Sequence, residues 1–154
     1  MKLLVLEVCK GRTPWADTAA GDYLARIGRY ARIEERALKP AARGIEKERA
    51  RLDEGGRLLA ATRPGDRVVV LDERGDGLDT MAFRDLLGQG ERGSYRRLVF
   101  LLGGPFGHHP STRAKAHKVL SLSPLVLNHQ VARVLLLEQI YRGFTLLRGI
   151  PYHH

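Results

Sequence analysis

The chain has 154 residues, of which 44% are hydrophobic and 28% charged, as in an ordinary globular domain and unlike a disordered or collagen-like chain. A single cysteine excludes an internal disulfide framework and fits a reducing cytosol. No apolar run approaches the roughly 20 residues of a membrane span, and no cleavage site follows the apolar start. We therefore expect one soluble, cytoplasmic domain over residues 1–154, without membrane contact.

The charge is strongly basic and unevenly spread. Lys and Arg number 26 against 17 Asp and Glu, a net +9. Residues 101–154 hold six of the bases, one acid and all six histidines, which leaves 20 bases and 16 acids to residues 1–100. This distribution favours a polyanionic partner, most often nucleic acid. A basic surplus that serves only solubility is the alternative.

The first elements alternate between strand and helix patterns. Lys2–Val8 is an apolar run typical of a buried strand. Thr13 followed by Pro14 predicts a helix start, with Thr13 as the N-cap. Arg32–Leu38 alternates weakly, as a strand does. The charged stretch 43–62 predicts a solvated helix that is interrupted near its two adjacent glycines, Gly55 and Gly56.

The middle of the chain predicts two strands that are covered on both faces. Arg67–Leu71 is continuously apolar and is followed by a polar, glycine-rich loop over 72–77. A short helix is expected over Thr80–Leu87, and Leu98–Leu102 is the second covered strand. A further helix is expected from Pro110 to about Leu120.

The C-terminal part holds the strongest helix pattern. Pro124–Leu127 is a third short apolar run, and a helix follows from about His129 to Leu147, with Asn128 as its N-cap. Because this helix is apolar almost all round, it is expected to be central or buried in a subunit interface. The alternation of strands and helices predicts an α/β fold with a mostly parallel sheet flanked by helices.

Three predicted strand ends are candidates for a ligand site: those after Leu71, after Leu102 and after Leu127. In open α/β sheets, ligands bind beyond the carboxyl ends of the strands. The turn at 103–107 contains three glycines, which lets a ligand approach the backbone, although a tight turn out of a buried strand explains it equally well. It matches neither a Walker A loop nor a dinucleotide fingerprint.

The polar candidates lie near the two ends of the last helix. His129 and Arg133 share one face near the helix N-terminus, where the dipole favours an anion; a capping role for His129 is the alternative. Tyr152 and His153 follow the helix and can stack on a base or hydrogen-bond to it, while Arg142 and Arg148 can take phosphates.

We expect no metal site. His108, His109 and His117 have no cysteine or carboxylate at ligand spacing, and Cys9 is interpreted as a small core residue. No nucleophile elbow and no paired carboxylates accompany the polar residues of the C-terminal half, so hydrolase chemistry is unsupported.

Several motifs together resemble RlmH-type ribosomal RNA methyltransferases of the SPOUT class over essentially the whole chain. They are Leu-Leu-Gly-Gly-Pro-x-Gly at 101–107, Leu-Ser-Leu-Ser at 120–123, His129 with Arg133-Val134, Glu138-x-x-Tyr141-Arg142 and the closing Pro151-Tyr152-His153. The chain departs from the family pattern at Phe106, where many members have an acid, at Asn128, where proline is common, and in ending at His154 without a basic tail.

The resemblance implies a homodimer with a deep C-terminal trefoil knot, in which about 98–154 binds the cofactor and the last helix forms the interface. It implies S-adenosylmethionine as cofactor, without a metal, and methylation of N3 of a pseudouridine in large-subunit (23S) ribosomal RNA. The cofactor pocket is implied at Leu71, Gly104, Leu122, Ser123, Pro124, Leu125, Val126, Leu127 and Asn128. Substrate-side residues are implied at His129, Arg133, Arg142, Arg148, Tyr152 and His153.

Catalytic roles are implied for three residues of this set. His153 is a candidate base for the N3 proton, Arg142 could stabilise charge on a neighbouring carbonyl, and Tyr152 is the third candidate. The alternatives are a non-catalytic RNA-binding or ribosome-assembly module of the same fold, a paralogue that methylates another RNA, and a nucleotide-binding protein of flavodoxin-like shape.

Overall fold

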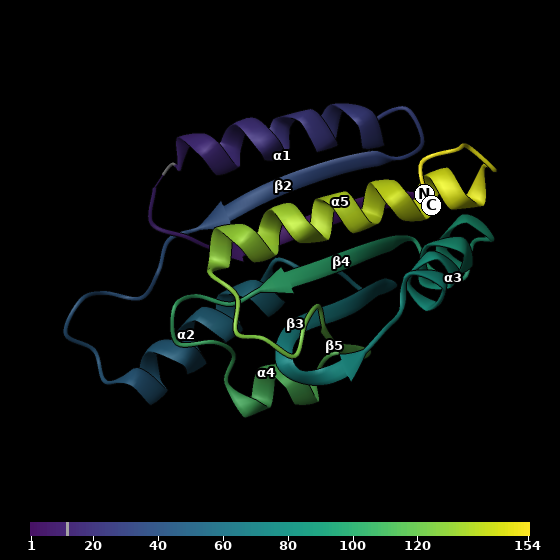
Figure 1. Cartoon of the computed structure of the whole chain (residues 1–154). Helices are drawn as coiled ribbons and strands as arrows, with labels where there is room; N and C mark the ends of the chain where they lie inside the picture. Colours follow the sequence, from purple (N-terminus) through teal and green to yellow (C-terminus); the bar gives the residue numbers. More distant parts are fainter. Residues whose placement is uncertain (12) are drawn as a thin grey trace.

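Five parallel strands form one sheet, and helices cover both of its faces (Figure 1). The computed structural model describes residues 1–11 and 13–154. The strand order is β2-β1-β4-β3-β5. The strands are β1 (Lys2–Val8), β2 (Arg32–Leu38), β3 (Asp66–Gly77), β4 (Arg97–Leu102) and β5 (Lys118–Ser121). The helices are α1 (Pro14–Ile27), α2 (Lys47–Ala60), α3 (Thr80–Glu91), α4 (Pro110–Ala114) and α5 (His129–Leu147). The expected α/β fold with a parallel sheet is confirmed.

Alternate side chains of the central strands enter two separate cores. Leu3 and Val5 of β1 pack in the core under α1, α3 and α5, whereas Leu4 and Leu6 pack with Leu58 of α2 on the other side. Since both faces are buried, the central strands are continuous apolar runs rather than alternating ones. On its face of the sheet, α5 packs against both α1 and α3 (Figure 1).

One prediction for the first half is wrong in detail. Helix α2 runs through Gly55 and Gly56 without interruption. Its N-terminus is capped by Glu46, whose carboxylate accepts the N–H groups of Glu48 and Arg49. Thr13 is the N-cap residue of α1, as predicted, but its hydroxyl makes no capping bond.

The largest errors concern the segments around β5. The predicted helix 110–120 ends at Ala114 and is followed by the strand β5. Pro124–Leu127 forms no strand. The predicted loop 72–77 instead continues β3, because it pairs with β5 after a register shift between Leu71 and Asp76.

Helix α3 extends to Glu91, four residues beyond the prediction.

Candidate functional site

A pocket of about 650 Å³ lies at the carboxyl edge of the sheet. The segments that follow the apolar parts of β3, β4 and β5 all line it, although they are far apart in the chain. Parallel strands bring their carboxyl ends to one edge, so this meeting follows from the topology. Eight of the nine residues predicted for the cofactor line the pocket: Leu71, Gly104, Leu122, Ser123, Leu125, Val126, Leu127 and Asn128. Pro124 belongs to the same segment and is not among the lining residues.

Short side chains shape the segment 122–128 beside this pocket. The Ser121 hydroxyl donates to the Ser123 carbonyl (2.8 Å), and the Ser123 hydroxyl accepts the Leu125 N–H (2.9 Å). Asn128 caps α5, as predicted, by accepting the Gln130 N–H (2.9 Å). The loop nevertheless leaves Leu125 73% and Val126 81% exposed. Apolar side chains held in the open at a pocket rim are typical of a surface that a ligand or partner covers.

The glycine turn after β4 is required by packing as well as by its place in the pocket. A Cβ on Gly104 would lie 2.8 Å from Oε2 of Glu54 and 3.2 Å from the Val8 side chain. Gly107 adopts a φ of +73°, which favours glycine, and its N–H donates to the Gly104 carbonyl. Phe106 is about half exposed in the pocket wall, and its ring centroid lies 5.8 Å from the Lys47 ammonium nitrogen. The tight-turn interpretation is therefore confirmed, and ligand contact at this turn stays a prediction.

His108 is a pocket residue that sequence reasoning considered only as a metal ligand. Its side chain lines the pocket and the residue is 2% exposed. Burial lowers the pKa of the imidazole below its usual value, so it is neutral at pH 7. Within residues 1–11 and 13–154, its Nε2 has no hydrogen-bond partner. The glycines beside it were the available signal, because they mark the turn that carries His108 into the pocket.

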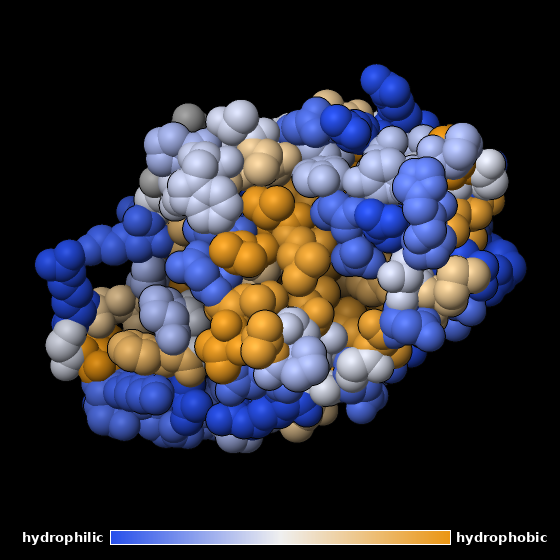
Figure 2. Space-filling model, in the orientation of Figure 1, coloured by the Kyte–Doolittle hydropathy of each residue, from blue (hydrophilic) through white to orange (hydrophobic). Residues whose placement is uncertain are grey.

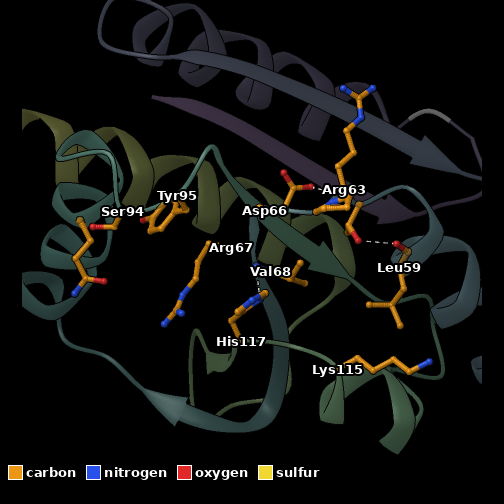
Figure 3. A pocket seen from close by; sticks show the side chains of 13 residues that line it. Leu59, Arg63, Asp66, Arg67, Val68, Ser94, Tyr95, Lys115 and His117 are labelled. Carbon is orange, nitrogen blue, oxygen red and sulfur yellow. Dashed lines mark hydrogen bonds between the residues drawn. The ribbon is translucent and has the colours of Figure 1, made fainter.

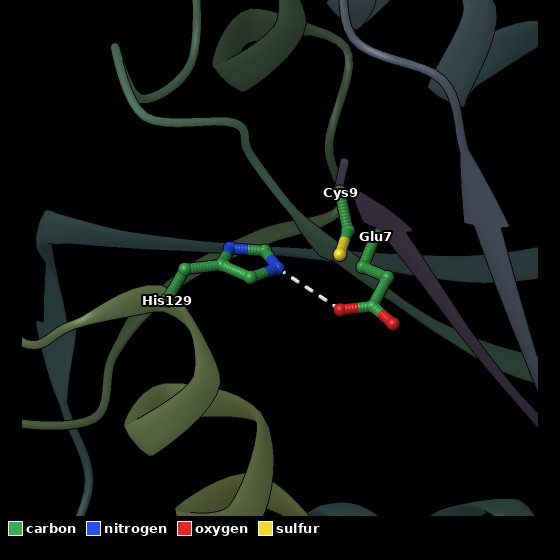
Figure 4. Close-up of side chains that lie close together, drawn as sticks. All are labelled: Glu7, Cys9 and His129. Carbon is green, nitrogen blue, oxygen red and sulfur yellow. Dashed lines mark hydrogen bonds and ion pairs between the residues drawn. The ribbon is translucent and has the colours of Figure 1, made fainter. Parts of the chain in front are cut away.

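At the other rim of the pocket, His129 and Arg133 are both engaged with carboxylates. His129 Nε2 lies 2.9 Å from a carboxylate oxygen of buried Glu7 (Figure 4). Arg133 donates to both oxygens of Glu35 (2.9 and 2.8 Å) and to Asp17 (2.7 Å), which raises its pKa. The arginine is 8% exposed. Its geometry is that of a residue that fixes α5 to α1 and β2 rather than of an exposed phosphate ligand.

The three candidate catalytic residues lie together at the far end of α5. Arg142 donates to Glu138 (3.0 and 2.7 Å) and lies 4.7 Å from the Tyr152 ring centroid. Tyr152 also donates to Glu138 (3.1 Å), and burial together with Tyr23 and Glu138 raises its pKa. Arg142 Nη1 is 3.3 Å from Nδ1 of His153. Arg142 follows His129 by 13 helical residues, about 20 Å at 1.5 Å per residue.

Comparison with known proteins decides the family. The family model described as "Predicted SPOUT methyltransferase" matches residues 1–153. Proteins named "Ribosomal RNA large subunit methyltransferase H" from Geotalea daltonii and Trichlorobacter lovleyi are 43% and 40% identical to the chain, and both alignments cover 100% of each protein. The chain belongs to the SPOUT methyltransferase family. The homologue of the same name from Geotalea uraniireducens is 38% identical, again over the full length of both chains.

A second pocket of about 610 Å³ opens at the opposite, amino edge of the sheet of this SPOUT methyltransferase (Figure 3). His117 lies in it with Nδ1 accepting the Val68 N–H (3.1 Å), and Asp66 at its edge pairs with Arg97 (2.7 Å). Figure 3 shows Arg63 and Arg67 pointing in different directions. None of the predicted site residues lines this pocket. This second pocket therefore contains several cationic side chains, but they do not point toward one common position.

One face of this SPOUT chain is apolar where the sheet ends and α5 begins. Figure 2 shows hydrophobic side chains gathered over α5 and the segment before it. The most exposed among them are those of Leu125, Val126 and Val131, and we call these three residues the apolar patch. The helix buries one face in the core and presents the other outward. In the described part of the chain, no helix is long and apolar enough to cross a membrane.

Proposed function

We propose that this chain binds S-adenosylmethionine in the carboxyl-edge pocket and methylates N3 of a pseudouridine in large-subunit ribosomal RNA in the cytoplasm. The observation that carries the proposal is the meeting of three distant segments around one pocket, at positions that the family resemblance assigns to the cofactor. The name of the homologues, which cover the whole chain, gives the RNA class. The net charge of +9 suits such a polyanion.

The residues of the pocket fit that cofactor. A volume of about 650 Å³ is within the range of small-molecule sites, which are mostly apolar with a few polar groups. Leu122, Leu125 and Leu127 would hold the adenine between apolar walls. The unpartnered Nε2 of His108 is a polar atom that a bound group can satisfy. When bound, S-adenosylmethionine supplies an electrophilic methyl group on its sulfonium.

The separation of pocket and catalytic candidates supports a homodimer. In one chain, Arg142 lies about 20 Å along α5 from the pocket rim, too far to meet a base that is held at the pocket. A second copy that packs antiparallel on the outer face of α5 would bring its own cluster to this pocket. The apolar patch lies on that face and is exposed in the single chain. Two-fold pairing is also the commonest oligomeric symmetry.

The remaining chemistry is the removal of the N3 proton. The guanidinium of Arg142 has only donors, and its Nη1 lies 3.3 Å from Nδ1 of His153, where that nitrogen can serve as the acceptor. If Arg142 turns to the substrate carbonyl beside N3, it stabilises the developing negative charge and frees Nδ1 to accept the proton. Glu138 holds both Arg142 and Tyr152 and is a positioning residue.

The proposal includes one domain over 1–154 and a trefoil knot within 98–154. The path of the chain supports the knot. After the edge strand β5, the segment 122–128 lines the pocket together with residues 71–74 of β3 and the turn after β4. Helix α5 then packs between α1 and α3 near the middle of the sheet. Knots are rare enough that this path alone would not suggest one.

Two measurements test the function. Calorimetric titration with S-adenosylmethionine should give one site per chain, displaceable by S-adenosylhomocysteine; absence of binding overturns the pocket assignment. Labelled methyl should be incorporated into ribosomes, large subunits or free rRNA that lack the modification, and not into the same material when it already carries it. Cofactor binding without incorporation into any RNA would favour a non-catalytic RNA-binding module, and incorporation elsewhere would favour a paralogue with another target.

A further inference from the structure

A carboxylate, a thiol and an imidazole meet at the rim of the pocket. The ligand atoms of Glu7, Cys9 and His129 all lie within 4.8 Å of one another (Figure 4). Glu7 and Cys9 are two residues apart at the end of β1, so an extended chain presents them on one side. His129 is the first residue of α5. Among the residues that the structure describes, this is the one group of three or more such side chains with that geometry.

The buried Glu7 carboxylate has one close partner and one more distant one. The residue is 5% exposed, and in the described part of the chain its side chain makes one hydrogen bond, to His129 (2.9 Å). Arg133 Nε approaches the other oxygen only to 3.7 Å, because the same N–H donates to Glu35. A buried carboxylate is usually paired or bound to a metal ion. Glu7 therefore shares the guanidinium of Arg133 with Glu35 and Asp17, and its oxygens keep acceptor capacity for an ion beside His129.

The combination of oxygen, sulfur and nitrogen donor atoms indicates which metal ion the site would bind. Zinc binds these three donors at about 2.0 to 2.3 Å in a tetrahedron, which places the donors about 3.5 Å apart. Magnesium and calcium require oxygen ligands and would not use the thiol. Cys9 lies just after the strand end and is only partly buried. For its sulfur to reach the tetrahedral spacing, the thiol would have to give up its hydrogen bond to the Gly11 carbonyl (3.2 Å). With three protein ligands, a fourth position stays open beside the pocket that His129 lines.

We propose that Glu7, Cys9 and His129 form a binding site for a divalent ion of the zinc class. The site adjoins the cofactor pocket but does not depend on the proposed methyl transfer. Sequence reasoning missed it because His129 is 120 residues from Cys9, and only the packing of α5 beside β1 joins them. The ion occupies the space between side chains of the protein's own fold, so it should bind the free chain.

Cobalt titration of the metal-free protein tests the site. Co²⁺ substitutes for Zn²⁺, and a cysteine ligand produces a sulfur-to-metal charge-transfer band in the near ultraviolet. We expect this band to saturate at one ion per chain and to disappear on addition of Zn²⁺. Since Cys9 is the only cysteine, the band reports on this residue alone. Absence of the band at saturating Co²⁺ overturns the proposal.

Matched variants locate the ion. Cys9→Ser should abolish the band, and Glu7→Gln and His129→Ala should each weaken Zn²⁺ binding by at least about 100-fold, since loss of a supporting partner alone costs 10–100-fold. His154→Ala is the control, because exposed histidines at the C-terminus can also attract metal; it should leave the band unchanged. Equal affinity in Glu7→Gln or His129→Ala overturns the ligand set.

A measurement on the unmodified sequence covers the case in which a variant does not fold. Stoichiometric Zn²⁺ should slow the reaction of the Cys9 thiol with a disulfide reagent by at least tenfold, and a chelator should restore the rate. An unchanged rate overturns the proposal. Titration with S-adenosylmethionine in the same samples separates the two hypotheses: cofactor binding without protection of the thiol retains the proposed function and rejects the metal site.

Discussion

Gly55 of α2 lies directly against Thr112 of α4. A Cβ on Gly55 would be 1.9 Å from the Thr112 hydroxyl oxygen, and Thr112 is 1% exposed. The glycine is therefore the residue that allows α4, which follows the pocket turn, to approach α2. This contact explains a glycine in the middle of a helix, where it otherwise costs about 1 kcal/mol relative to alanine.

Replacement of the two adjacent glycines by alanine should have opposite effects. Among the residues that the structure describes, a Cβ on Gly56 would meet nothing within 4 Å. Gly56→Ala should therefore raise the free energy of unfolding by about 0.5–1 kcal/mol through helix propensity. Gly55→Ala should lower it by about 1–3 kcal/mol, because the added methyl group overpacks the contact with Thr112. Urea denaturation of the two variants measures both values.

The double variant Gly55→Ala/Thr112→Ala isolates the contact. Because removal of the hydroxyl makes room for the methyl group, the double variant should be more stable than the sum of the single effects predicts, with a coupling of at least about 0.5 kcal/mol. Strict additivity would show that the two helices do not pack in this way.

Arg133 should matter more for stability than for RNA contact. Arg133→Met leaves Glu35 and Glu7 without their guanidinium and should cost about 3–5 kcal/mol, as the loss of one partner of a buried ion pair does. Arg148→Met breaks an exposed pair with Glu91 and should cost no more than about 1 kcal/mol. Chemical denaturation gives both values. A stable Arg133→Met protein with weaker, less salt-dependent RNA binding would instead assign Arg133 to a phosphate.

His108 should make the protein less stable in mild acid. Burial lowers its pKa in the folded state below the ordinary value of 6.5. At pH values between the folded-state pKa and 6.5, the unfolded chain binds more protons than the folded one. The contribution of the neutral, buried His108 to the free energy of unfolding is therefore complete above about pH 6.5. It is lost as the pH falls toward the folded-state pKa. Melting temperatures between pH 8 and 5 should fall more steeply for the natural sequence than for His108→Leu.

The control for His108 is a histidine that is exposed. His154→Leu should follow the same pH profile as the natural sequence, since its side chain is open to solvent. If His108→Leu also parallels the natural sequence, then His108 titrates equally in both states and its burial has no electrostatic cost. Titration of His108→Leu with S-adenosylmethionine at pH 7.5 additionally reports whether the unpartnered Nε2 contributes to the ligand.

Local patterns predicted most elements because their sequences agree with their final environments. Lys2–Val8 and the segment from His129 to Leu147 form the predicted strand and helix, with the predicted cap at Asn128. The strand β5 was missed because Lys118–Ser121 is short and follows a stretch with helical composition. Only its pairing with β3 stabilises it as a strand. The two strand backbones approach closely at Gly75, since a Cβ there would be 2.7 Å from the Leu120 backbone.

The candidate site also has parts that the sequence could predict and parts that it could not. The pocket could be predicted, because it depends on the rule that parallel strands end at one edge and on motifs that lie within short segments. The engagement of Arg133 with Glu35 could not, since these residues are 98 positions apart and meet only when α5 packs on β2. The same holds for His129 with Glu7 and Cys9. Periodicity identifies which side chains face inward but not which polar partners they meet.

Mixed dimers test whether the site combines two copies of the chain. His153→Ala should remove turnover while it leaves cofactor binding intact, and Leu127→Glu should block the pocket while it leaves the α5 cluster intact. If each site uses the pocket of one protomer and the cluster of the other, a mixed dimer regains one complete site of two. Random pairing makes half of the dimers mixed, so co-refolded variants should recover about a quarter of the natural activity.

Each variant alone should stay inactive, and each should be confirmed as a folded dimer before mixing. If the pocket and cluster of the same chain acted together, the mixed dimer would contain no complete site and no activity would return.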